Sequence, residues 1–199
     1  MGCCSSQQAS GEEIQRKIAV VGDSGVGKTS LIQYFMTNDF DEYTPQEYIA
    51  SALKVDEKLV ELKKDKKVRL YIYDTGGQET FKHLRKLNYP KSDAVIICFS
   101  VENSESLQNV KKNWVPEMQK LCPGIPMLLV GNKVDLRNSA RTIKNFVRHA
   151  DGRNMAKGNK MVSYIECSAK EGENVKEVFD HIAQVAVKRK VIRKDTEEA

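Results

Sequence analysis

The chain has 199 residues and a formal net charge of +5, with 40% hydrophobic and 30% charged residues. This length allows one domain with a full core and is too short for two ordinary domains. No apolar run approaches the ~20 residues that cross a bilayer, and the five cysteines form no zinc-like pairs. No aromatic residues interleave the lysine clusters to suggest base stacking. We therefore expect a soluble globular protein that does not bind nucleic acid.

The pattern along the chain predicts alternating strands and helices. Residues 1–14 are small and polar and are expected to form a flexible arm, followed by one domain over 15–190 and a polar tail over 191–199. Short apolar runs predict buried strands at 17–22, 94–100, 125–131 and 161–166. Alternation over 49–62 and 68–74 predicts a hairpin, and helices are expected over 29–40, 104–121 (despite Pro116) and 175–190. This order indicates an α/β fold with a mostly parallel sheet covered on both faces.

A glycine-rich loop follows the first predicted strand and precedes the first predicted helix. It reads Gly22, Asp23, Ser24, Gly25, Val26, Gly27, Lys28, Thr29, with Ser30 next, and fits GxxxxGK[ST]. Glycines let the backbone N–H groups point at phosphate oxygens, and the helix N-terminus adds partial positive charge. Lys28 is expected to reach the outer phosphates and the Thr29 hydroxyl to ligate magnesium. The motif predicts nucleoside triphosphate binding without specifying the base.

A second polar motif follows the strand at 125–131 and is suited to guanine. It consists of Asn132, Lys133 and Asp135. A carboxylate at Asp135 can accept hydrogen bonds from N1–H and the exocyclic amine of guanine, whereas adenine would leave the charge unpaired. Lys133 would lie along the base, and Asn132 would hold the loop together.

Two further loops complete the predicted site. Asp74 ends a strand and is expected to hold magnesium, while the Gly77 amide would bond the terminal phosphate and Gln78 would orient the attacking water. After the strand at 161–166, Ser168, Ala169 and Lys170 would offer backbone N–H groups to the guanine carbonyl.

These four motifs, in this order, resemble those of the Ras superfamily of small GTPases over residues 16 to 190. The resemblance implies a P-loop NTPase (small G-protein) fold with a six-stranded sheet, binding of GTP or GDP with Mg²⁺, and slow GTP hydrolysis involving Gln78 and Lys28. It also implies a monomer that an exchange factor and a GTPase-activating protein control and that binds effectors. Phe40 matches the family's aromatic residue that packs edge-on to guanine.

The middle of the chain resembles the Rho branch. The LRKLNYP run, the helix around Trp114 and the cysteine-proline before the strand are Rho features, and the segment between Asp135 and Glu166 fits a shortened form of the Rho extra helix, ending in GRNMA. The phosphate loop with Ser24 is closer to Rab proteins, so a Rab-like trafficking GTPase is an alternative. The family's first-switch threonine is displaced here: Thr44 is the candidate for magnesium and phosphate contacts.

The N-terminal arm fits a lipidation pattern. Gly2 is expected to be myristoylated after removal of Met1, and Cys3 and Cys4 to be palmitoylated, which would supply the second signal that stable anchoring needs. The chain ends without a cysteine for prenylation. We therefore expect attachment to the cytoplasmic face of a membrane, the plasma membrane in particular.

Two functional alternatives to a cycling Rho-like switch remain from the sequence. The displaced switch threonine favours a GTP-bound scaffold that no longer cycles, although Gln78 argues against it. A P-loop kinase is disfavoured by the guanine motif and by the lack of an arginine-rich lid.

Overall fold

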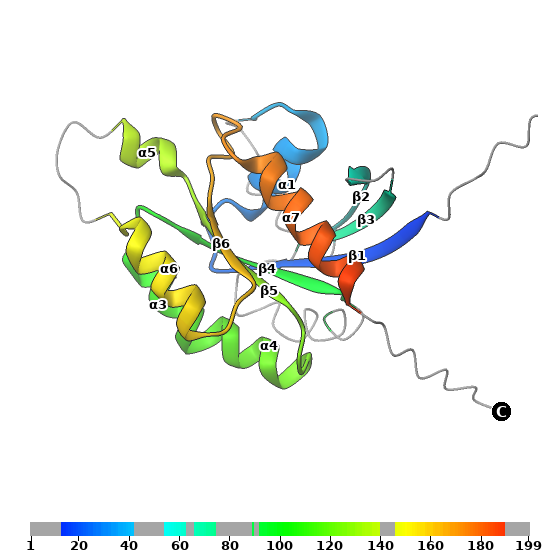
Figure 1. Cartoon of the computed structure of the whole chain (residues 1–199). Coiled ribbons are helices and arrows are strands. Elements are labelled where there is room, and N and C mark those ends of the chain that lie inside the picture. Colours follow the sequence, from blue (N-terminus) through cyan, green and yellow to red (C-terminus); the bar gives the residue numbers. More distant parts are fainter. Residues whose placement is uncertain are drawn as a thin grey trace, which may run out of the picture.

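The computed structural model describes residues 13–41, 54–62, 66–74, 89, 92–139 and 146–189 (Figure 1). Within these residues one sheet has the strand order β2-β3-β1-β4-β5-β6. Its strands are β1 (Ile14–Val21), β2 (Lys54–Leu62), β3 (Lys66–Asp74), β4 (Ala94–Ser100), β5 (Met127–Asn132) and β6 (Ser163–Glu166). β2 pairs antiparallel with β3, as the predicted hairpin requires, and the other described pairs are parallel. The predicted six-stranded, mostly parallel sheet is confirmed.

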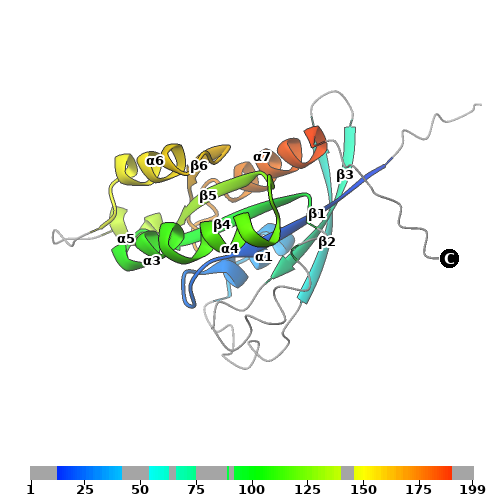
Figure 2. The same cartoon turned by 90° about the horizontal axis from the view of Figure 1, so that it is seen from below.

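Helices cover both faces of this sheet (Figures 1 and 2). They are α1 (Lys28–Thr37), α3 (Ser104–Asn109), the π-helical turn η4 (Val110–Trp114), α4 (Val115–Leu121), α5 (Val134–Asn138), α6 (His149–Gly158) and α7 (Val175–Lys188). Helices α1 and α7 pack on one face, and α3, η4, α4 and α6 pack on the other. None of the described helices has the length and apolarity that crossing a bilayer requires.

The strand side chains alternate between two separate cores. In β1, Ile18 and Val20 face the core under α1 and α7, whereas Ala19 and Val21 face the core under α3 and α4. Because both faces are covered, all seven residues of β4 are buried, which explains its continuous apolar run. The rings of Phe35 and Phe179 stack with centroids 3.9 Å apart and fasten α1 to α7.

The first strand begins earlier than the apolar run predicts. It starts at Ile14, within the range 1–14 that the sequence predicts as a flexible arm, and its polar first half pairs with β3 from Ile14↔Val68 onward. Strand β3 of the β2–β3 hairpin is long enough to pair with the first residues of β1. The backbone pairing therefore continues where the side chains of β1 are mostly polar and not buried.

The predicted helix over 104–121 is helical throughout but changes type in its middle. Pro116 has no N–H to donate to the residue four positions before it, so the α-helical pattern cannot continue unbroken there. The N–H of Val115 instead donates to the carbonyl of Val110, five residues back. Pro116 itself lies at the start of α4, where the ring is tolerated.

The region assigned to a shortened extra helix differs from expectation. Residues 152–156 (GRNMA) lie in the interior of α6, which continues to Gly158, and do not end a separate helix. A short helix, α5, directly follows the Asn132 motif, and residues 140–145 between the two helices lie outside the described part of the chain.

The topology brings the predicted motifs to one edge of the sheet. Strands β3, β1, β4, β5 and β6 run parallel, so their carboxyl ends lie side by side. In open sheets of this kind, ligands bind outside the carboxyl ends of the strands.

Candidate functional site

The glycine-rich loop connects β1 directly to α1, and at two of its three glycines with positive φ there is no room for a Cβ. Gly22 has φ 144° and lies so close to β4 that an added Cβ would collide with the main-chain oxygen of Cys98. Gly27 has φ 89°, and a Cβ there would collide with the side-chain amide of Asn132. Between them, Ser24 and Gly25 are exposed while Val26 is buried in the core. The loop is thus held tightly at both ends and opens to the outside at its middle.

Lys28 begins α1 and lies beneath the loop. Only 6% of this residue is exposed, and its Nζ donates to the carbonyl oxygens of Gly22 at 2.9 Å and Asp23 at 2.7 Å. The ammonium is therefore positioned by the same loop whose N–H groups are expected to receive phosphate. Such an arrangement favours a multiply charged anion at the N-terminus of α1.

A hydroxyl and a carboxylate meet beside the start of α1. The Thr29 Oγ1 donates a 2.6 Å hydrogen bond to Oδ2 of Asp74, the last residue of β3. Asp74 is brought there because Val20, at the end of β1, pairs with it in the parallel ladder. Both groups supply oxygen ligands, which Mg²⁺ prefers.

Asn132 joins three of the predicted motifs. Its Nδ2 donates to the carbonyl oxygens of Val26 (3.0 Å) and Gly27 (3.2 Å), and its Oδ1 accepts from the backbone N–H of Ala169 (3.2 Å). The residue is 1% exposed. A buried amide with these partners fixes the relative positions of the phosphate loop, the β5 motif and the loop after β6.

The remaining base-side residues surround Asp135. Its Oδ1 accepts a 2.6 Å hydrogen bond from the fully buried Ser168 hydroxyl, so the carboxylate is oriented by the loop after β6. Lys133 has a positive φ of 68° and an ion pair with Glu102 (2.8 Å). Lys170 is exposed in the loop after β6. In this group the Asp135 carboxylate has a fixed orientation.

Other predicted residues are placed differently or lie elsewhere. Phe40 is half-buried and packs against the core under α1 and α7. Ser30 is half-buried in the first turn of α1. The predictions for Gly77, Gln78, Thr44, Gly2, Cys3 and Cys4 lie outside the described residues.

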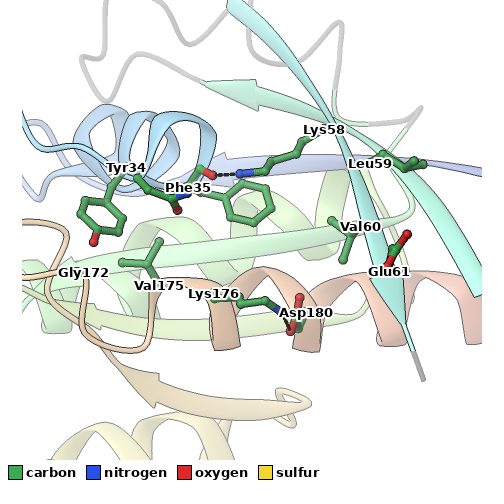
Figure 3. Close-up of a pocket in the computed structure, with 11 residues that line it drawn as sticks. Tyr34, Phe35, Lys58, Leu59, Val60, Glu61, Gly172, Val175, Lys176 and Asp180 are labelled. Atoms are coloured by element: carbon green, nitrogen blue, oxygen red, sulfur yellow. Dashed lines mark hydrogen bonds and ion pairs between the residues drawn. The ribbon is translucent and has the colours of Figure 1, made fainter.

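A cavity of about 570 Å³ lies on another part of the surface. Figure 3 shows it between the end of α1, strand β2 and the start of α7, lined by Tyr34, Val60 and Val175 among others. The Lys58 ammonium donates to the carbonyl of Phe35 across it (Figure 3). None of the predicted site residues lines this cavity, so it is separate from the phosphate loop.

Sequence analysis missed an ion pair that supports the base side of the site. Arg137, in α5, binds both carboxylate oxygens of Glu166 at the end of β6, and Tyr164 donates to the same carboxylate at 2.8 Å. Burial raises the pKa of Glu166, but the hydrogen bonds from Arg137 and Tyr164 outweigh it and hold that pKa below the ordinary value. The signal available in the sequence was a lone arginine two residues after Asp135 and an acidic residue ending the next strand.

The comparisons with known proteins agree with this arrangement. Residues 17–188 match the family model "Ras family". The chain is 40% identical over 188 residues to the Rho-related GTP-binding protein RhoB of Homo sapiens, and equally to that of Mus musculus and of Rattus norvegicus. Each alignment covers 89% of this chain and 91% of the relative.

Proposed function

Because the chain belongs to the Ras family of small GTPases and is Rho-related, we propose that it is a signalling switch controlled by its bound nucleotide. The family membership makes the chain a GTPase, which binds GTP and hydrolyses it to GDP. In the proposed cycle, the GTP-bound form binds effectors and hydrolysis ends that state.

The observation that carries the proposal is the buried Asn132 amide. It joins the phosphate loop at Val26 and Gly27 to the Ala169 N–H, so a phosphate site and a base site are held at a fixed separation. A nucleotide spanning both would bind a surface that is already organised, which lowers the entropic cost of binding.

We assign the phosphate-side roles as follows. The loop N–H groups and the Lys28 ammonium bind the phosphates and stabilise the charge that develops on them during hydrolysis. The proposed role of Gln78 is to orient the attacking water, which a glutamine performs without a shifted pKa.

We assign magnesium to Thr29 and Asp74. One hydroxyl and one carboxylate fit a cation that is completed by phosphate oxygens and water rather than by a protein cage. When bound, magnesium would neutralise charge on the phosphates.

We assign guanine recognition to Asp135. Its carboxylate is oriented by Ser168 and would pair with both N–H groups of the guanine edge. Discrimination against adenine by such a site is ~10⁴-fold or more. Lys133 would lie along the base.

The proposed partners are an exchange factor, a GTPase-activating protein and effectors, and the proposed location is a membrane. Gly2, Cys3 and Cys4 would provide a double lipid anchor at the cytoplasmic face, the plasma membrane being the proposed site. The identity to RhoB supports a Rho-like rather than a Rab-like partner set.

A second candidate function is a GTP-bound scaffold that hydrolyses too slowly to cycle. It rests on one sequence observation, that Thr44 precedes Pro45 instead of following it as the Rho motif has it. Thr44 would then fail to complete the magnesium and phosphate contacts.

Nucleotide selectivity tests the proposed site. Purified protein stripped of nucleotide is offered equal GTP and ATP with magnesium, and the retained nucleotide is identified by chromatography. We expect GTP alone in the wild type and loss of selectivity in Asp135→Ala, with Glu177→Ala as a carboxylate control at an exposed position of α7. Equal retention of ATP by the wild type would overturn the assignment of the base site.

A further inference from the structure

The carboxylate of Asp23, in the phosphate loop, accepts hydrogen bonds from two side chains of the helical segment α3–η4. This segment covers the face of the sheet opposite to α1 and α7. The Asp23 Oδ1 accepts from the indole Nε1 of Trp114 at 2.7 Å, and its Oδ2 accepts from Nδ2 of Asn109 at 2.8 Å. The partners lie 91 and 86 positions away in the sequence. Both carboxylate oxygens of a loop residue are therefore engaged by one remote element.

The same residue also holds Lys28 through its main chain. The Asp23 carbonyl oxygen accepts from the Lys28 Nζ at 2.7 Å. An unbroken series of hydrogen bonds thus runs from Trp114 through Asp23 to the ammonium that the proposed function assigns to the phosphates. Hydrogen bonds to an ionised carboxylate are among the stronger ones in proteins.

The π-helical turn explains why these two donors share one face. Asn109 and Trp114 are five residues apart, and in an α-helix that spacing would separate their directions by about 140°. The wider turn at Val110–Trp114 has hydrogen bonds between residues five apart, which brings positions i and i+5 toward the same side. Such turns inside helices occur frequently at functional sites.

Both donors are themselves fixed. Trp114 is 5% exposed within the core under α3 and α4, so its ring is held by packing. The Asn109 Oδ1 accepts from Asn113 at 3.3 Å, which orients the amide with its Nδ2 toward Asp23. The loop therefore rests against a rigid support.

We propose that Trp114 and Asn109 are positioning residues for the nucleotide site, acting through Asp23 to hold the phosphate loop and Lys28 in the conformation that binds phosphate. The inference rests on the proposed assignment of residues 22–29 to the phosphates. Without this support, the loop would have to be ordered by the nucleotide itself, and the nucleotide would dissociate faster.

The test is the rate of GDP dissociation from purified, folded full-length protein, measured with a fluorescent GDP analogue. We expect Trp114→Phe and Asn109→Ala each to accelerate dissociation about tenfold, as the loss of one charge-assisted hydrogen bond implies. Asn154→Ala, which removes the same atoms from an exposed position on α6, should leave the rate unchanged.

Two further variants separate positioning from general stability. Asp23→Asn keeps an oxygen that can accept from Trp114 but turns an NH2 group toward the Asn109 amide, so it should match Asn109→Ala, whereas Asp23→Ala loses both bonds and should dissociate GDP faster than either single-bond variant. The Asp23→Ala and Trp114→Phe double variant should dissociate GDP no faster than Asp23→Ala alone, because Asp23→Ala already removes the bond to Trp114. If Trp114→Phe does not fold, the inference is tested by Asn109→Ala, at a half-buried position, together with Asp23→Asn and Asp23→Ala.

The sole tryptophan gives a direct readout of the contact. Its emission should change in Asp23→Ala, which removes the group bonded to the indole, and be unchanged in Asn154→Ala. Wild-type dissociation rates in folded Asn109→Ala and Asp23→Ala, or additive effects in the double variant, would overturn the inference. A wild type that retains no guanine nucleotide would instead overturn the proposed function on which the inference rests.

Discussion

The side-chain nitrogen of Asn132 lies 3.2 Å from the carbonyl oxygen of Gly27, although 105 positions separate the two residues in the sequence. Gly27 has no side chain at the point where a Cβ would occupy the position of that amide. The glycine and the asparagine therefore fit each other, and the contact joins the phosphate side of the site to the base side.

Replacing Asn132 by alanine should loosen this junction. The variant leaves the Val26 and Gly27 carbonyls and the Ala169 N–H without their buried partner, at a cost of about 2–3 kcal/mol in the free energy of unfolding. GTP affinity should fall at least tenfold. Urea unfolding and nucleotide binding measure the two effects, with Asn154→Ala at an exposed position of α6 as control. Wild-type affinity in Asn132→Ala would show that the junction does not organise the site.

Magnesium dependence should follow the Thr29–Asp74 pair. Thr29→Asn removes a hydroxyl that hydrogen-bonds Asp74 and adds bulk, so we expect weaker GTP binding and little further loss when EDTA removes magnesium. Thr37→Asn makes the same change at the other end of α1 and should retain the magnesium response. Titrating magnesium against the dissociation of bound GTP measures this. An unchanged GTP affinity in Thr29→Asn would refute the assignment.

The Arg137–Glu166 pair predicts how stability depends on pH. The pKa of Glu166 is lower in the folded protein than its ordinary value of 4.5, so the unfolded chain binds the proton at higher pH. The stabilisation is thus complete above pH 4.5 and is lost as the pH falls through the folded-state pKa. Glu166→Gln should be less stable by about 2 kcal/mol at pH 7, with the difference shrinking toward pH 3.

Urea unfolding at several pH values measures this dependence. The control is Glu177→Gln, an exposed carboxylate on α7, which should follow the wild type. If Glu166→Gln differs from the wild type by the same free energy of unfolding at pH 3 and at pH 7, the Arg137–Glu166 ion pair is not the source of that difference.

Much of the architecture was predictable because a strand that is buried on both faces has a continuous apolar sequence. The run at β4 is apolar throughout since each of its residues enters one of two cores. The motif loops follow parallel strands, so their convergence at one edge follows from topology.

Other features depend on contacts that local pattern does not record. The polar start of β1 gives no apolar signal, since backbone pairing with β3 orders it and the Arg16 guanidinium donates to the Ala186 carbonyl. The contact of Asp23 with Trp114 joins segments 91 positions apart in the sequence. Only their spatial arrangement reveals that the Asp23 carboxylate faces the helical segment at Asn109 and Trp114.

The lipid anchor is tested by Gly2→Ala. Removing the amino-terminal glycine blocks myristoylation, and since one acyl chain binds only marginally, losing it should release the protein from membranes. Cys3→Ser with Cys4→Ser should leave the myristoyl group and weaken attachment. Fractionation of cells fed a clickable myristate measures both. Persistent membrane attachment of Gly2→Ala, without label, would contradict the proposed anchor.

The most direct test of the central claim is single-turnover hydrolysis of GTP preloaded on the purified protein with magnesium, with the bound nucleotide identified by chromatography over time. We predict slow conversion to GDP over minutes to hours, accelerated by a Rho-type GTPase-activating domain, with that acceleration lost in Gln78→Leu. GTP that persists for days on the wild type, with or without the activating domain, would contradict a cycling switch and establish the scaffold in its place.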